Sequence, residues 1–104
     1  MTRCEFFTED DRITGFSVSG HSGYSEAGSD IVCAGVSAIS FALIGYLQQR
    51  ETEAQISGGT GSLAIDCRGD ERAASAFDMA LCGWLQIAAN YPHHVEVYIA
   101  TEGG

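Results

Sequence analysis

One long apolar stretch, residues 31–49, constrains the fold of this chain more than any other feature. It contains no proline and no turn cluster, so it is predicted to be a helix. Residues 22–29 come before it, carry two glycines and show no apolar period, which indicates a loop. Asp30 lies between the two and is the natural N-cap of the helix. The chain is therefore organised around a loop that leads into the start of an apolar helix.

Apolar side chains cover much of the circumference of this helix, so we expect it to be mostly buried, in part by a partner subunit. They are Val32, Val36, Ile39, Leu43, Ile44 and Leu47. The small residues Ala34, Gly35 and Ala38 would let the first half of the helix approach a sheet closely.

Two residues in this region can carry nucleophilic chemistry. Cys33 is the third residue of the predicted helix, where the helix dipole and unpaired N–H groups favour a thiolate. His21 lies in a glycine-rich turn and could take the thiol proton. This arrangement suits a thiol hydrolase. The other interpretation is structural: Cys33 as a small buried hydrophobe, His21 as a surface histidine, Asp30 as a cap only and Ser37 as a small helical residue.

The stretch GHSGYSEAGSDIVCAGVS, residues 20–37, resembles the signature of the bacterial ribosomal-processing cysteine protease family, Prp. The order of strands and helices agrees over almost the whole chain. Many members have alanine where this chain has Ser22 and Gly35, and both changes keep the side chain small. The resemblance implies a catalytic pair, His21 and Cys33, and two supporting residues, Asp30 and Ser37. It also implies a substrate loop that contains Gly20, Ser22, Gly23, Tyr24 and Gly28.

By the same resemblance, the expected activity is endopeptidase removal of a short N-terminal extension from a large-subunit ribosomal protein, and the expected assembly is a homodimer. Cys33 would attack the peptide carbonyl and His21 would donate a proton to the leaving amine. We expect backbone N–H groups of residues 32–34 to bind the oxyanion. Asp30 either orients His21 or only caps the helix. Residues 22–29 are predicted to be a mobile lid that brings His21 and Cys33 together when peptide binds.

Charge and cysteine content restrict the partners. The 104 residues fit one domain, and fourteen acidic against five basic residues give a net charge of −9. This charge disfavours nucleic acid and anionic membrane as direct partners and suits a basic ribosomal protein precursor, although acidity also serves solubility. None of the four cysteines forms a C-x-x-C, no N-terminal signal is recognisable, and Ser37, Ser40 and Gly45 interrupt the apolar helix. We therefore expect a cytoplasmic protein with reduced thiols.

The remaining chain alternates short strands with one more helix. The predicted strands are residues 3–8, 12–19, 53–57, 62–67 and 94–100, and the second helix runs from an N-cap at Asp70 to about Asn90. The first two strands form a hairpin through the acidic turn at residues 9–11. The order is ββαββαβ, which predicts a single α/β (α+β) domain with a mixed or mainly antiparallel sheet and two packed helices.

Apolar periodicity also predicts which residues face the core. On the second helix these are Phe77, Leu81, Trp84, Leu85 and Ala88, and on the last strand Val95, Val97 and Ile99. Cys67 is expected in the core or an interface, and Cys82 is expected to be buried and inert.

His93 and His94 do not predict a metal site, because neighbouring strand residues point to opposite faces and no second ligand cluster has suitable spacing. We expect no metal and no cofactor. Two other functions stay open: a non-catalytic ribosome-associated binding protein, and a thiol redox sensor that uses Cys33 and would need a resolving cysteine.

Overall fold

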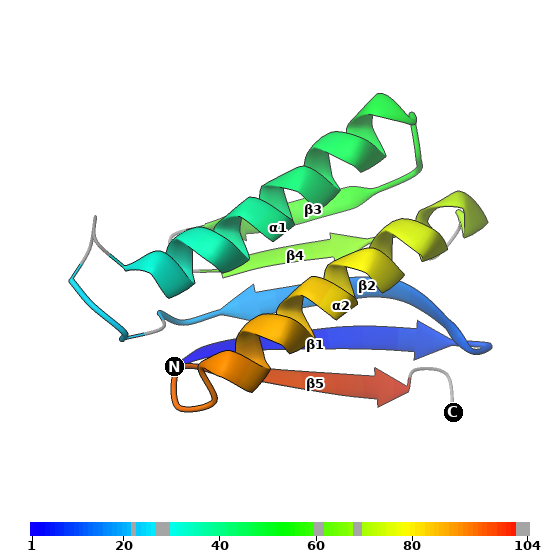
Figure 1. Cartoon of the computed structure of the whole chain (residues 1–104). Helices are drawn as coiled ribbons and strands as arrows, with labels where there is room; N and C mark the ends of the chain where they lie inside the picture. Colours follow the sequence, from blue (N-terminus) through cyan, green and yellow to red (C-terminus); the bar gives the residue numbers. More distant parts are fainter. Residues whose placement is uncertain (22, 27–29, 60–61, 68–69, 102–104) are drawn as a thin grey trace.

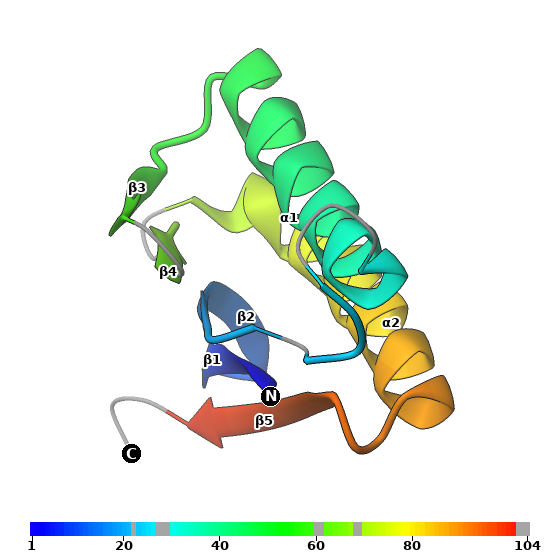
Figure 2. The same cartoon turned by 90° about the vertical axis from the view of Figure 1, so that its left-hand side faces the viewer.

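The computed structural model describes residues 1–21, 23–26, 30–59, 62–67 and 70–101. Five strands form one sheet in the order β3-β4-β2-β1-β5, and α1 and α2 cover the same face of it (Figures 1 and 2). Only β1 and β5 pair in parallel, so the sheet is mixed. The predicted fold class and element order are confirmed, with one short 3₁₀ helix, η1, added. The elements are β1 (Thr2–Glu9), β2 (Arg12–Ser19), α1 (Ile31–Gln49), β3 (Gln55–Gly59), β4 (Ser62–Asp66), η1 (Glu71–Ala73), α2 (Ala74–Asn90) and β5 (Val95–Thr101).

The predicted acidic turn closes the β1–β2 hairpin. Glu9 pairs with Arg12, and the two residues between them, Asp10 and Asp11, have φ angles of 53° and 64°. Two consecutive positive φ angles define the two-residue turn whose twist matches that of the flanking strands. Aspartate tolerates this conformation better than most side chains, so the local sequence fixes the register of the hairpin.

Aromatic residues from three elements fill the layer between the sheet and the helices. Phe6 of β1 stacks on Phe16 of β2 with ring centroids 5.5 Å apart, and Phe16 meets Phe77 of α2 edge-on at 6.3 Å. Trp84 of α2 is also fully buried. Such pairs add about 0.5–1.5 kcal/mol beyond the area they bury. These contacts hold α2 directly on the sheet.

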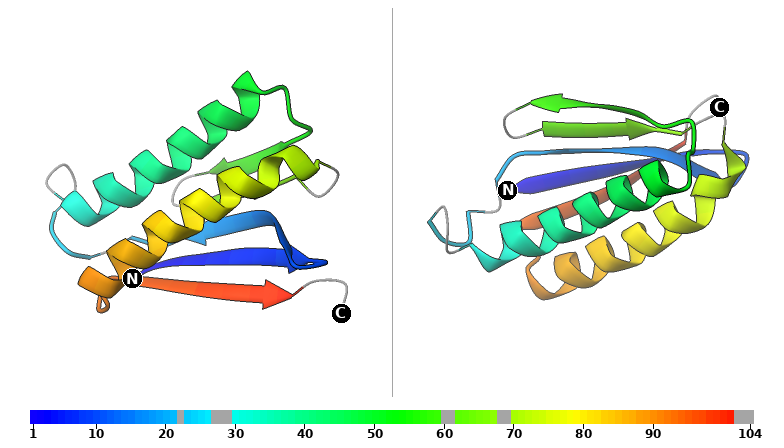
Figure 3. Two further views of the ribbon diagram at one scale, coloured as in Figure 1. Left: turned by 45° about the vertical axis from the view of Figure 1, so that its right-hand side comes forward. Right: turned by 90° about the horizontal axis from the view of Figure 1, so that it is seen from above.

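The two helices run side by side over the sheet (Figure 3), and α1 packs chiefly against α2. A Cβ atom added at Gly35 would lie 3.3 Å from the Cδ1 atom of Ile87 in α2. Ala34 and Ala38 are exposed. The prediction that these small residues bring α1 close to the sheet is therefore wrong: Gly35 faces α2, and the two alanines face outward.

Two residues predicted to face the core are exposed. Leu85 is 45% exposed, because it lies about 100° around the helix from Trp84 and outside the buried side of α2. Ile99 is 60% exposed on the edge strand β5, and Figure 1 shows α2 crossing the sheet diagonally, away from the end of that strand. The apolar period predicted both elements correctly, but it did not predict which of their residues neighbouring elements cover.

By length and composition alone, α1 could cross a membrane: it has 19 residues and contains an 18-residue window with a mean hydropathy of 1.8. The sequence argument from Ser37, Ser40 and Gly45 is therefore insufficient. Packing is more informative, because Val32, Val36, Ser40, Leu43 and Leu47 are all buried in this fold. One side of α1 thus belongs to the protein core.

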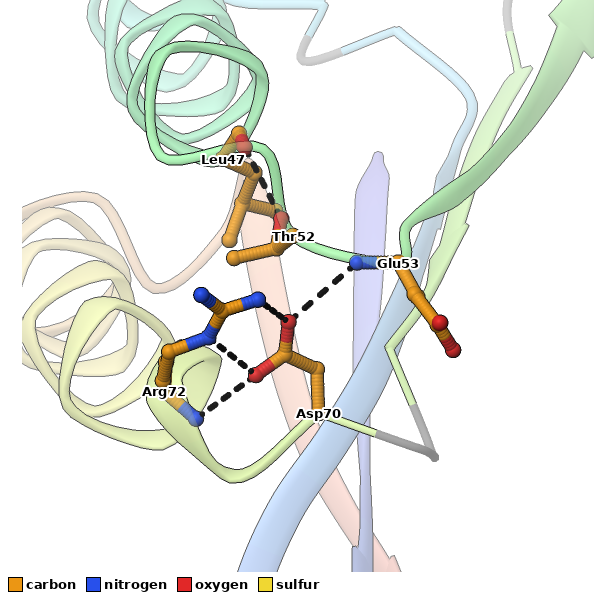
Figure 4. Close-up of polar contacts among 5 residues, drawn as sticks. All are labelled: Leu47, Thr52, Glu53, Asp70 and Arg72. Atoms are coloured by element: carbon orange, nitrogen blue, oxygen red, sulfur yellow. Dashed lines mark hydrogen bonds and ion pairs between the residues drawn. The ribbon is translucent and has the colours of Figure 1, made fainter.

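The carboxylate of Asp70 joins two connections of the chain: the one from α1 to β3 and the one from β4 to η1. The Asp70 side chain is only 6% exposed and accepts hydrogen bonds from the Glu53 amide at 3.2 Å and the Arg72 amide at 3.0 Å (Figure 4). The Arg72 guanidinium adds two bonds at 3.0 and 2.8 Å. The Arg72 side chain, followed by the two amides, holds the pKa of Asp70 well below its usual range. Asp70 therefore caps η1, as predicted, and also holds the segment between α1 and β3.

We expect Asp70→Asn to lower the melting temperature by several degrees near pH 6, because a charged acceptor of four hydrogen bonds is lost. The folded-state pKa is lowered, so this stabilisation is complete above the unfolded pKa of about 3.9 and is lost as the pH falls below it. The difference in melting temperature between wild type and variant should therefore become smaller below about pH 4, as measured by thermal unfolding monitored by circular dichroism. Asp78→Asn, at an exposed position on α2, is the matched control. A difference in melting temperature that is the same at pH 3 as at pH 6 would contradict this role of Asp70.

Candidate active site

His21 is held at the end of β2 by a turn that only glycine can make. Gly20 has a φ of +88°, and a Cβ atom there would lie 2.4 Å from the carbonyl oxygen of Met1. The Met1 main-chain nitrogen donates to the His21 carbonyl at 2.5 Å. The start of β1 therefore fixes the backbone on which His21 sits.

Cys33 is held by the capped first turn of α1. Asp30 Oδ1 accepts from the amides of Val32 at 3.0 Å and Cys33 at 2.9 Å, and Asp30 Oδ2 accepts from the Ser25 amide at 3.4 Å. Capping, the role that the sequence left open beside orientation of His21, is thus shown for Asp30. Because the carboxylate also reaches Ser25, it ties the substrate loop to the helix start.

This cap engages the amides that we expected to bind the oxyanion. Val32 and Cys33 donate to the Asp30 side chain, and the Ala34 amide donates to the Asp30 carbonyl at 3.0 Å. An N–H group that already donates has little capacity for a second strong acceptor. The expected oxyanion hole at residues 32–34 is therefore not available in this conformation.

A cleft of about 690 Å³ brings His21 and Cys33 to one surface, between α1 and the β2, β3 and β4 side of the sheet. Ser37, one turn after Cys33, lines the same cleft. A second cavity of about 560 Å³ adjoins it, and His21, Cys33 and Ser37 line both, with Asp30 and Gly23 at the second. The second cavity is thus lined by four predicted site residues: His21, Asp30, Cys33 and Ser37. A thiol, an imidazole and a hydroxyl at one open cleft can carry out acyl transfer.

The comparisons agree with this geometry. Residues 1–96 match the family described as "Cysteine protease Prp". The chain belongs to the Prp family of cysteine proteases. The predicted resemblance is confirmed. A search of curated proteins finds no match.

Solved structures share the Prp fold of this chain. SMU.848 from Streptococcus mutans is 29% identical, with a TM-score of 0.80 over 98% of this chain and 96% of that one. The ribosomal processing protease Prp from S. aureus, solved with a covalently linked product peptide, is 22% identical, with a TM-score of 0.89 over 95% and 99% of the two chains. The same S. aureus protein with a substrate peptide gives 21% identity and a TM-score of 0.82 over the same shares of the two chains.

Tyr24 anchors the first part of the loop in this Prp family member. Its ring meets Tyr91 edge-on at 5.3 Å and His94 at 5.4 Å, both in the connection from α2 to β5. No local sequence pattern predicts this contact between the loop and the connection from α2 to β5. Residues 22 and 27–29, and with them the predicted loop residues Ser22 and Gly28, lie outside the described part of the chain. The predicted lid, residues 22–29, therefore contains an anchored aromatic residue at Tyr24.

The four cysteines of this Prp have different environments. Cys4 and Cys67 are buried, and burial raises the pKa of both thiols, that of Cys67 to about 11. Cys33 is partly exposed at the cleft. Cys82 is exposed, so its predicted burial is wrong: it lies two positions from the buried Trp84, about 200° around α2.

The glycine-rich end of β3 has a role at the cleft that sequence analysis missed. Ile56, Gly58 and Gly59 line the cleft opposite α1. Their place at the cleft that Cys33 also lines depends on the pairing of β3 with β4, which no local sequence pattern predicts. Within the described ranges, no group of three His, Cys, Asp or Glu residues could hold a metal ion.

Gly20→Ala tests whether the turn positions His21. The substitution forces a side chain into a positive φ and against the Met1 carbonyl, so we expect a loss of about 1–3 kcal/mol in unfolding free energy. Peptidase turnover should fall further than this loss of folded protein explains, because the imidazole shifts. Gly45→Ala, within α1 with open space around it, is the control and should stabilise by about 0.5–1 kcal/mol. Urea unfolding measures the loss of stability, and turnover is measured under conditions in which the variant is folded. Unchanged turnover in folded Gly20→Ala would contradict the role of the Gly20 turn in positioning His21.

Proposed function

We propose that this protein is an endopeptidase in which Cys33 is the nucleophile and His21 the general base and acid. Its substrate is a large-subunit ribosomal protein precursor, from which it removes a short N-terminal extension. The observation that carries this proposal is that His21, Cys33 and Ser37 line the same cleft in a Prp fold. The S. aureus Prp structures, described as those of a ribosomal processing protease, support the substrate class.

The reaction proceeds through a thioester. His21 takes the Cys33 proton, the thiolate attacks the peptide carbonyl, and imidazolium protonates the amine as the C–N bond breaks. Water, deprotonated by His21, then releases the acyl group. Since the amides of residues 32–34 donate elsewhere, the Ser37 hydroxyl supplies a donor for the oxyanion from the same cleft.

Charge supports a basic substrate. The chain carries a net charge of −9, whereas the described residues that line the main cleft include no Lys, Arg, Asp or Glu. The acidity therefore acts over long range on the approach of a basic precursor rather than within the cleft. The cytoplasm fits this substrate and the four free thiols.

A redox sensor is the weaker alternative. It needs a resolving thiol, and the accessible candidate, Cys82, lies on the side of α2 opposite Trp84, which lines the cleft. A purely binding protein needs no reactive thiol.

Cleavage and alkylation together test the nucleophile, in a Cys82→Ser background that removes the other exposed thiol. The protein should shorten a ribosomal-protein precursor, and Cys33→Ala should abolish this without a change in melting temperature. Iodoacetamide should modify Cys33 and spare Cys4 and Cys67, whose thiols are buried with raised pKa values. Peptide mass mapping and intact-mass analysis of the precursor give the result. Cleavage that survives Cys33→Ala would exclude this cysteine as the nucleophile.

The outward side of α1 supports a homodimer. Ile31 is 58% exposed and Tyr46 39%, and with the exposed Ala42 they form a row of apolar side chains on a helix whose opposite side is in the core. Phe41, 70% exposed, lies beside this row and lines the cleft. A second copy of this chain would cover this row, because two copies present the same surface to each other across a two-fold axis.

Ala42→Glu, on this exposed side of α1, should convert the dimer to a monomer, because a charge would be buried at the interface. Light scattering after size-exclusion chromatography should give twice the chain mass of 11.0 kDa for wild type and the single mass for the variant. Met79→Glu places the same charge at a residue 72% exposed on α2 and should stay dimeric. A wild-type protein that is monomeric at all concentrations would refute this interface.

A further inference from the structure

Three aromatic rings meet where the loop before α1 touches the connection from α2 to β5. The Tyr24 ring lies edge-on to Tyr91 and to His94, with interplanar angles of 85° and 83°. Edge-to-face packing is an arrangement that aromatic pairs prefer, and it fixes the orientation of a ring as well as its position. Tyr91 and His94 thus form an aromatic socket for the Tyr24 ring, and both lie far in sequence from residues 20–37.

Backbone hydrogen bonds hold the aromatic socket on three elements of the fold. The Tyr91 amide donates to the Ile87 carbonyl of α2 at 2.8 Å, and the Tyr91 carbonyl accepts from the His94 amide at 3.0 Å. The His94 carbonyl accepts from the Thr2 amide of β1 at 2.9 Å, directly before β5 begins. The connection that carries the socket is therefore fixed at both ends, whereas Tyr24 lies on a loop. It follows that the socket sets the position of the loop.

The residues on either side of Tyr24 line the cavity beside Cys33. Gly23 and Ser25 form part of the wall of the cavity of about 560 Å³ that His21 and Cys33 also line. The opposite wall belongs to the first turns of α1. The width of this cavity depends on where the loop stands relative to the helix start. By holding Tyr24, the aromatic socket therefore controls the space next to the cysteine.

The two residues of the proposed catalytic pair have supports of their own, separate from the aromatic socket. The backbone of His21 is held by the turn at Gly20 and by the Met1 main-chain nitrogen. The Cys33 amide is held by the side chain of Asp30. Loss of the socket should therefore release the loop segment between them while the pair itself stays in place. An effect of the socket can thus be separated from an effect on the chemical step.

We propose that Tyr91 and His94 are positioning residues, which hold the loop through Tyr24 so that the cavity beside Cys33 is open before a peptide arrives. A loop that is ordered in advance loses less conformational entropy when a peptide binds along it. The aromatic socket therefore increases the affinity for the peptide and contributes little to the chemical step. This consequence rests on the proposed peptidase function, whereas the hold on the loop does not.

Matched variants test the aromatic socket through kinetics. Tyr91→Leu and His94→Ala each remove one ring and should raise KM at least about threefold, with kcat changed less than about twofold. Tyr91→Phe, which keeps the ring, and His93→Ala, at the exposed neighbouring position, should behave as wild type. Turnover is measured at a temperature at which circular dichroism shows every variant to be folded. Equal KM values for Tyr91→Leu and Tyr91→Phe, or a kcat that falls more than KM rises, would overturn the proposal.

Amide exchange gives a second readout that needs no turnover. In the free protein, the amides of residues 23–26 should exchange at least about threefold faster in Tyr91→Leu and His94→Ala than in wild type, while the amides of α1 keep their rates. Mass spectrometry of peptic fragments measures both segments. If loop exchange rises in this way but the wild type cleaves no precursor, the proposed peptidase function fails and the aromatic socket stands. Loop exchange that is equal in wild type and both variants would refute the socket even if cleavage occurs.

Discussion

α1 packs chiefly against α2, and α2 packs against β2 and β5. On the β3 and β4 side of the sheet, α1 therefore lies over the strands without packing closely on them. Strand β3 is exposed along its whole length. The main cleft lies in this region, between α1 and the glycine-rich end of β3. Trp84, which is fully buried in the core, also lines this cleft. The packing of one helix on another thus sets the position of the substrate site.

The cap at Asp30 changes how the thiol can be activated. A capping carboxylate stabilises the helix by about 1 kcal/mol, but it engages the amides of Val32 and Cys33. Its full negative charge also opposes the roughly half positive charge of the helix dipole near Cys33. The proposed transfer of the Cys33 proton to His21 therefore gains little from the helix start. The proposed mechanism depends more on the turn at Gly20, which holds the backbone of that histidine.

Features that depend on local chemistry could be predicted from the sequence. The turn at Asp10 and Asp11, the caps at Asp30 and Asp70 and the order of elements all follow from short-range preferences, and the structure has each of them. Errors arose where exposure depends on a distant element. The burial predicted for Cys82 and Ile99 and the direction of Gly35 needed the crossing of α2 over the sheet. The place of Trp84 at the wall of the cleft could not be predicted for the same reason.

The residues that line the cleft differ in how freely they can change. His21 and Cys33 lie close in sequence and at the surface, whereas Trp84 is both a wall of the cleft and a fully buried core residue. Replacing such a tryptophan with a small residue leaves a cavity that costs about 3–5 kcal/mol, a large share of the stability of a domain this size. Thr2→Val removes the hydroxyl with almost no change in volume. The shape of this cleft is therefore coupled to folding through α2, whereas its β1 side can be altered with less loss of stability.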